Sequence, residues 1–246
     1  MKKFIGYLTY GYPDRRNTLF WIGEFIRQKV DVLEIGIPYS DPLADGPTIQ
    51  NAAFSSLRKK EYDIKQILRS LSPFTRRIPS VILSYYNPVR RMGMERFLKE
   101  AGAAGIWGVL LPDLLFEEGQ EWRRLCRKYG IRNIEMVAPN TSLKRIRMIA
   151  AETAGFLYHV SVLGVTGARR NLGPGLIKRL RGIKRLGLSV PVYLGFGFSE
   201  PSQIRRVLPY CDGVIVGSAI VRQLKQKKKL CAYLKTIGNV IHSFRR

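Results

Sequence analysis

Short apolar runs alternate with longer amphipathic segments along the whole chain. The runs are rich in β-branched and aromatic residues, which favour buried strands. We expect strands at 4–9, 30–35, 81–85, 108–111, 133–137, 156–160, 192–194 and 213–216. Between them, apolar residues recur at helical spacing, as in Leu19, Ile22 and Ile26, so each segment has one face to lay on the strands. This alternation is typical of repeated βα units that build a parallel sheet.

The eight expected strands are the number that closes a (β/α)8 barrel, and 246 residues is the usual size of one such domain. We therefore expect an α/β fold, a single TIM barrel over residues 1–246. Asp63 and Ser142 stand before helical patterns as N-caps. An extra helix, about 49–59, is predicted after the second strand, and a long loop after the sixth. A doubly wound sheet uses the same alternation but normally shows G-x-G-x-x-G after its first strand, where this chain has Gly11-Tyr12-Pro13.

The stretch from Asp31 to Gln50, DVLEIGIPYSDPLADGPTIQ, carries the strongest candidate chemistry. Glu34 lies in an expected buried strand, where desolvation raises the pKa of a carboxyl toward neutrality and lets it exchange protons. The loop that follows is stiffened by glycine and proline and holds two more acids, Asp41 and Asp45. The spacing alone fits equally well a structural ion pair between Glu34 and one of the many basic residues.

Glycines follow the last three expected strands. In barrels, phosphate is often held by the loops after strands seven and eight, which here contain Gly197 and then Gly217-Ser218. Their joint placement indicates a phosphorylated ligand. The loop after strand six, with Thr166 and Gly167, is long and glycine-rich, which suits either a mobile lid or a plain connection.

Net charge adds an alternative. The chain has 42 Lys and Arg against 18 Asp and Glu, a formal charge of +24. Such a balance raises nucleic-acid binding as a hypothesis. The basic residues are spread over most predicted helices, however, and only 178–185 and 225–229 form dense patches. Solvated helix faces explain most of the charge, so a nucleic-acid partner is not the favoured interpretation.

Cysteine and histidine usage argues against a metal site. Cys126, Cys211 and Cys231 are widely spaced without C-x-x-C, which also argues against a disulfide framework. His159 follows Tyr158 in an expected strand, so the two face opposite sides and His159 is interpreted as a packing residue. No apolar run reaches the ~18 residues of a membrane span. We expect a cytoplasmic protein.

The string LEIGIPYSDPLADGPTIQ and the lid string GVTGA resemble the tryptophan synthase alpha family, and weaker matches extend from Phe4 nearly to the end of the chain. The resemblance implies a lyase that cleaves indole-3-glycerol phosphate by a retro-aldol reaction in tryptophan biosynthesis. Glu34 would be the general acid/base and Asp45 would contact the indole N–H. The remaining substrate positions implied are Tyr158, Thr166, Gly167, Gly197, Gly217 and Ser218.

The same resemblance implies a partner. The chain would act as the alpha subunit of an alpha2beta2 complex, and Asp41, Pro42, Asn87 and Asp113 match segments that face the beta subunit. No cofactor is expected in this chain, because the pyridoxal phosphate of the complete synthase belongs to the beta subunit. A weakly active scaffold that mainly activates the beta subunit, and a barrel acting on another sugar phosphate, remain as alternatives.

Several positions depart from the family pattern. Tyr12 stands where the family usually has Asp, and Arg169 and Arg170 follow the lid threonine in place of acidic or neutral residues. Glu135 interrupts an apolar strand, where we expect an ion pair or an outward orientation. The first strand also begins almost at the first residue, so the helix that usually precedes it in the family is expected to be missing.

Overall fold

A computed structural model describes residues 1–59, 63–161, 175–195 and 197–244. Within these ranges the strands form a closed parallel barrel in chain order, and all eight agree with the predicted runs to within two residues at each end. The strands are β1 (Lys3–Thr9), β2 (Val32–Gly36), β3 (Ser80–Leu83), β4 (Gly108–Leu110), β5 (Arg132–Val137), β6 (Leu157–Val160), β7 (Val192–Gly195) and β8 (Gly213–Val216).

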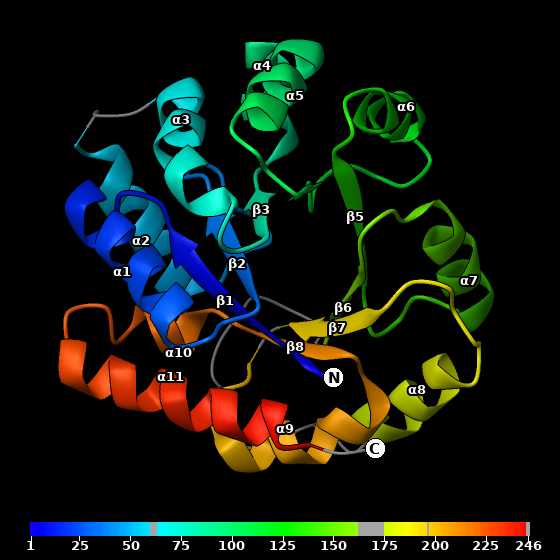
Figure 1. Cartoon of the computed structure of the whole chain (residues 1–246). Helices are drawn as coiled ribbons and strands as arrows, with labels where there is room; N and C mark the ends of the chain where they lie inside the picture. The colour runs from blue at the N-terminus through cyan, green and yellow to red at the C-terminus, as the bar shows by residue number, and fades with distance from the viewer. Residues whose placement is uncertain (60–62, 162–174, 196, 245–246) are drawn as a thin grey trace.

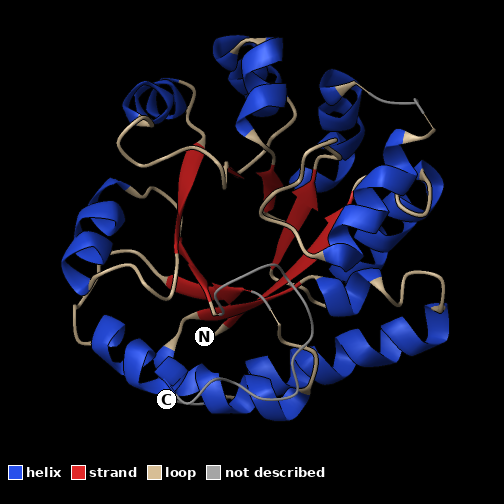
Figure 2. Cartoon of the chain, turned by 180° about the vertical axis from the view of Figure 1, so that it is seen from behind, coloured by secondary structure: helices blue, strands red, loops and turns tan. Residues whose placement is uncertain are grey.

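Helices surround this barrel on the outside, as both views show (Figures 1 and 2). They are α1 (Arg15–Arg27), α2 (Pro47–Leu57), α3 (Ile64–Thr75), α4 (Tyr86–Met92), α5 (Met94–Ala103), α6 (Gln120–Lys128), α7 (Leu143–Glu152), α8 (Gly175–Lys184), α9 (Pro201–Val207), the 3-10 helix η1 (Leu208–Tyr210), α10 (Ser218–Val221) and α11 (Lys227–His242). The expected extra helix after the second strand is α2, and the TIM-barrel prediction is confirmed.

Side-chain caps fix where several helices begin. Asp63 accepts a hydrogen bond from the backbone N–H of Gln66 at 2.7 Å, and Ser142 accepts one from Arg145 at 3.2 Å. Both residues satisfy backbone donors that have no partner inside the helix. Both predicted N-caps are therefore confirmed. Pro47 occupies the first turn of α2, where its missing N–H costs nothing.

The first residues of the chain lie close to the end of α11. The Asp31 carboxylate accepts hydrogen bonds from the Phe4 backbone N–H at 2.8 Å and from Lys3 Nζ at 3.0 Å, and it contacts His242 Nε2 at 2.7 Å. Lys2 also lies over the Phe244 ring. These contacts connect the end of α11 to β1 and to the start of β2, so the last helix packs as part of the outer layer of the barrel.

Glu135 in β5 is ion-paired, as expected. Its carboxylate lies 3.4 Å from Arg123 Nη1 of α6 and accepts a hydrogen bond from Asn133 at 3.0 Å. Burial still raises the pKa of Glu135 above its ordinary value, because the two partners only partly offset desolvation. Among the described residues, no helix is long and apolar enough to cross a membrane.

Candidate active site

A cavity opens at the carboxyl end of the barrel strands. It has a volume of about 40 Å³ and draws its walls from β1, β2, β3, β6 and β8, the start of α2, and the loops after β2, β7 and β8. Its described lining residues are Tyr7, Glu34, Asp45, Ile49, Leu83, Tyr158, Gly197, Phe198, Ile215, Gly217, Ser218, Ala219 and Arg222. Most of the residues that the sequence predicts for substrate binding are therefore brought together in one place.

Glu34 is a buried acid in the lining of this cavity. It sits on β2 beside Tyr7 of β1 and Val81 of β3 in the strand register, and only 1% of its surface is exposed. Its Oε1 atom has no hydrogen-bond partner among the described residues. Burial, with a smaller contribution from the charge of Asp45, raises the pKa of Glu34 to about 8. The structural ion pair considered from spacing alone is absent from the described part of the chain.

Asp45 reaches the same cavity from the loop after β2. The Tyr85 hydroxyl donates a hydrogen bond to Asp45 Oδ2 at 3.0 Å and accepts one from the backbone N–H of Ala44, also at 3.0 Å. Gln50 Nε2 donates a hydrogen bond to the backbone carbonyl oxygen of Asp45 at 2.9 Å. Burial raises the pKa of Asp45 to about 6, and the Tyr85 bond opposes that rise. Near pH 7 the cavity thus pairs a mainly protonated Glu34 with a mainly ionised Asp45.

Two tyrosine rings fill the space beside these acids because the neighbouring strands carry glycine. A Cβ atom at Gly36 would lie 2.1 Å from the Tyr7 hydroxyl, and one at Gly195 would lie 2.2 Å from the Tyr158 hydroxyl. Each ring therefore packs over the backbone of the next strand, where any larger residue would collide with it. Burial raises the pKa of both phenols, so they remain neutral.

The glycines and the hydroxyl predicted to hold phosphate, Gly197, Gly217 and Ser218, all line the cavity. Gly197 has φ of 88°, a conformation that favours glycine, and Ser218 begins the short helix α10. A Cβ atom at Gly217 would lie 3.5 Å from Tyr7, so a larger side chain there would project toward the cavity wall. Arg222 adds a guanidinium, whose Nη1 is 3.5 Å from Thr48 Oγ1.

The predicted partner residues divide into different environments. Asp41 is exposed and Pro42 is buried. Asn87 is exposed and donates a hydrogen bond from Nδ2 to the Tyr39 hydroxyl at 3.2 Å. Asp113 accepts hydrogen bonds from the Tyr86 backbone N–H at 2.8 and 3.1 Å, so it anchors the start of α4. The lid residues Thr166 and Gly167, with Arg169 and Arg170, lie outside the described residues.

The cavity also contains residues that the sequence did not single out. Tyr7 could have been found from alternation along the first strand, since the register places it beside Glu34. Arg222 had no such signal, because it is one of many basic residues and only the fold brings it to the cavity. His159 faces away from the cavity and is fully buried, as expected for a packing residue. The described residues hold no group of metal-ligating side chains.

A closed (β/α)8 barrel whose cavity is lined by two carboxyls of separated pKa and by glycines is typical of an acid–base enzyme for a phosphorylated substrate. The chain belongs to the tryptophan synthase alpha chain family, whose profile it matches over residues 1–239. Members of this family are lyases that act on indole-3-glycerol phosphate, and the chain is such a lyase.

Individual relatives agree with this assignment. The chain is 44% identical to the tryptophan synthase alpha chain of Shouchella clausii over 251 residues, which cover 98% of this chain and 92% of the relative. It is 42% identical to that of Carboxydothermus hydrogenoformans over 222 residues, covering 89% and 82%. A solved structure of Mycobacterium tuberculosis tryptophan synthase superposes with a TM-score of 0.87 at 33% identity and covers 98% of this chain and 92% of that one.

Proposed function

We propose that Glu34 and Asp45 carry out the retro-aldol cleavage of indole-3-glycerol phosphate to indole and glyceraldehyde 3-phosphate. The observation that supports these roles is the pair of carboxyls in one cavity, with pKa values of about 8 for Glu34 and about 6 for Asp45. When the surroundings of two carboxyls push their pKa values apart in this way, the group with the higher pKa can act as the acid and the other as the anion.

In the first step, protonated Glu34 donates its proton to C3 of the indole ring. The ring nitrogen then carries positive charge, which ionised Asp45 stabilises by accepting a hydrogen bond from the indole N–H. Cleavage of the bond between C3 and the side chain returns its electron pair to the ring. The side-chain hydroxyl loses its proton to the Glu34 carboxylate and becomes the aldehyde, so Glu34 ends the cycle protonated.

The glycine-lined part of the cavity would hold the phosphate. The backbone N–H groups near Gly197 and Gly217 and the Ser218 hydroxyl supply donors, and Thr166 and Gly167 are proposed to close over the site as its lid. Arg222 adds a cation within the same lining. Tyr158 packs beside the indole position.

A beta subunit is the proposed partner. The family name and the solved structures of tryptophan synthase support a partner subunit. We further propose that the two subunits form an alpha2beta2 complex in the cytoplasm, with pyridoxal phosphate held by the partner and no cofactor in this chain. Leu43 and Leu115, in the loops after β2 and β4, are 81% and 61% exposed at the carboxyl end of the barrel. Large apolar side chains so exposed on the same end as Asp41 support a protein contact there.

The test measures indole release by the purified chain, alone and with the beta subunit. Glu34→Gln should abolish indole formation while glycerol phosphate still binds, because the amide preserves shape but transfers no proton. Arg222→Gln should raise KM several-fold with little change in kcat, and Lys225→Gln, an exposed cation three residues away, serves as the control. Near-parental turnover by Glu34→Gln would remove the proposed mechanism.

A further inference from the structure

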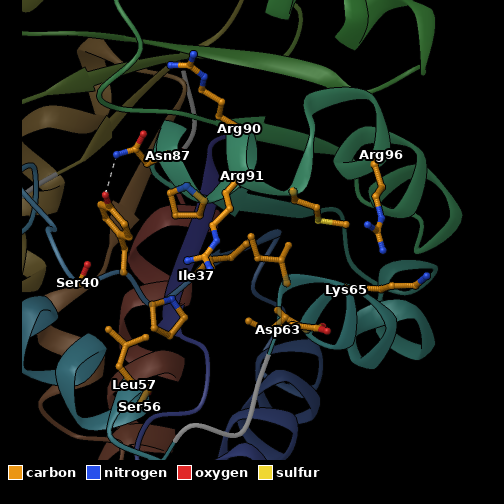
Figure 3. A pocket seen from close by; sticks show the side chains of 16 residues that line it. Ile37, Ser40, Ser56, Leu57, Asp63, Lys65, Asn87, Arg90, Arg91 and Arg96 are labelled. Carbon is orange, nitrogen blue, oxygen red and sulfur yellow. Dashed lines mark hydrogen bonds between the residues drawn. The ribbon is translucent and has the colours of Figure 1, made fainter.

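A second, larger hollow lies outside the barrel, beside the carboxyl ends of β2 and β3 (Figure 3). We call it the α3–α4 groove. It has a volume of about 1090 Å³ and is formed by the loop after β2, the end of α2, the start of α3, α4 and the start of α5. The described residues that line it are Ile37, Pro38, Tyr39, Ser40, Ser56, Leu57, Asp63, Ile64, Lys65, Ile67, Asn87, Pro88, Arg90, Arg91, Met92 and Arg96.

The floor of the groove is apolar. Ile37 and Ile67 are buried beneath it, with exposures of 6% and 3%. Ile64 and Met92 are partly buried and pack against the core, while Leu57 remains 39% exposed. An apolar floor of this kind can take an aliphatic or aromatic side chain from a bound segment, because covering these groups removes apolar surface from water.

The groove carries an excess of positive charge. Arg91 extends into its middle, Arg96 and Lys65 lie together on one flank, and Arg90 turns away (Figure 3). Neither Arg91 nor Arg96 forms an ion pair within 4.0 Å among the described residues. Among the described lining residues the only carboxylate is that of Asp63, and it already caps α3.

The described acid that pairs with Lys65 does not balance this charge either. Glu100 lies 2.7 Å from Lys65 and 3.7 Å from Arg69, so two cations already share it before Arg96 is counted. The Arg91 and Arg96 guanidiniums therefore remain available for external carboxylates. Guanidinium groups pair with carboxylates in a bidentate geometry, which favours acidic side chains as ligands.

The groove is continuous with the surface that faces the proposed partner. Asn87 belongs to that predicted surface, lines the groove and bonds to Tyr39, which also lines it. Ser40, another lining residue, donates a hydrogen bond to Asp41 at 2.8 Å in the same loop. A protein bound over Asp41 and the exposed Leu43 would thus have the groove at its edge.

We propose that the α3–α4 groove binds an acidic segment of the beta subunit, with carboxylates on Arg91 and Arg96 and an apolar side chain on the floor. The inference rests on the proposed function, because it requires that partner. A nucleic-acid duplex fits the groove less well, since phosphates need cations along an open surface and make no use of an apolar floor. The expected effect is on partner affinity and its salt dependence.

The experiment compares Arg91→Gln/Arg96→Gln with Arg76→Gln/Arg77→Gln. The second pair is also exposed and lies at the opposite end of α3, so both variants remove two positive charges. The affinity for the beta subunit from the same organism is measured at about 0.02 M and about 0.3 M salt, because screening distinguishes charge contacts from apolar ones. Lyase activity of each chain without partner checks that the barrel and its active site are intact.

Binding that is about tenfold weaker at low salt for the groove variant, with a smaller gap at high salt, would support the proposal; the control should change less than about twofold. Equal weakening in both variants would overturn it, because that result indicates general charge attraction. Parental affinity in the groove variant, or no beta binding by the parent, would also overturn it. Retention of each chain on duplex DNA is measured at the same two salt concentrations. A groove variant that loses DNA retention but keeps its affinity for the beta subunit would likewise contradict the proposal. Absence of indole release by the parent, by contrast, contradicts the proposed function itself.

Discussion

The Tyr85 hydroxyl donates to the carboxylate of Asp45 and accepts from the backbone N–H of the residue before it, both at 3.0 Å. One side chain from the end of β3 therefore fixes both the position and the charge of an acid on the loop after β2. Because the bond is made to a charged group, its loss should cost more than that of a neutral hydrogen bond.

Tyr85→Phe should consequently raise the pKa of Asp45 above about 6, since the bond that opposes its burial is removed. The acid limb of the kcat/KM profile should move to higher pH by about one unit, which corresponds to a bond to a charged group worth ~1.5 kcal/mol. The ratio of variant to parental activity should therefore rise with pH and approach one near pH 8. A uniform loss of activity at every pH would indicate instead that the loop had moved.

Much of the fold follows from the sequence because one periodic signal specifies it. Strands buried on both faces read as short apolar runs, and the eight runs matched the observed strands. Asp63 and Ser142 were found because a capping side chain acts on its own neighbourhood in the chain. The acid at Glu34 was found for the same reason, since its burial is visible in the adjacent apolar residues.

The rest of the site depends on contacts between residues far apart in sequence. Tyr85 reaches Asp45 across 40 positions, and Arg222 reaches Thr48 across 174. Neither contact leaves a local pattern. The glycines at 36 and 195 could be interpreted as turn residues, whereas their role is to make room for rings on the preceding strands. The α3–α4 groove likewise exists only once α3 and α4 have packed together.

The packing of Tyr158 over Gly195 gives a second prediction. Gly195→Ala should destabilise the protein by ~1–3 kcal/mol, because the added Cβ would lie 2.2 Å from a buried ring that cannot move without displacing its neighbours. Turnover should also fall, since Tyr158 lines the cavity. Denaturant unfolding followed by fluorescence measures the first effect.

Gly23→Ala is the matched control for this substitution. Gly23 lies within α1 and has nothing within 4 Å of an added Cβ, so alanine should leave activity unchanged and stabilise by ~0.5–1 kcal/mol through helix propensity. If Gly195→Ala changes stability and turnover no more than the control does, the packing of Tyr158 against Gly195 does not determine the shape of the cavity.

A third prediction concerns His159, which is fully buried with both ring nitrogens unpartnered in the described structure. Burial, and then the charge of Arg179, lowers its pKa to about 4. The unfolded chain, with an ordinary histidine pKa near 6.5, binds this proton more readily. The protein should therefore lose stability as pH falls from about 6.5 toward 4, by up to ~3 kcal/mol from this residue.

His159→Leu should flatten that part of the stability curve, because leucine has no proton to bind and no polar atom to leave unpaired. The free energy of unfolding, measured from pH 4 to pH 8, should show the parent and the variant diverging only below about 6.5. If the free energies of unfolding of the parent and the variant change in parallel from pH 4 to pH 8, His159 is protonated as readily in the folded protein as in the unfolded chain.

The last prediction joins the two acids through the pH profile of indole formation. The proposed mechanism needs Glu34 protonated and Asp45 ionised, so turnover should be highest between about pH 6 and about pH 8 and fall on both sides.

Part of the rise in the Glu34 pKa comes from the negative charge of Asp45. Asp45→Asn removes that charge, so the small residual activity should lose its acid limb and its alkaline limb should shift to lower pH. Asp113→Asn, which neutralises an exposed acid that anchors α4, should leave both limbs in place. If the alkaline limb of Asp45→Asn stays where it is in the parent, the two carboxyls titrate independently, and burial alone must account for the protonation of Glu34.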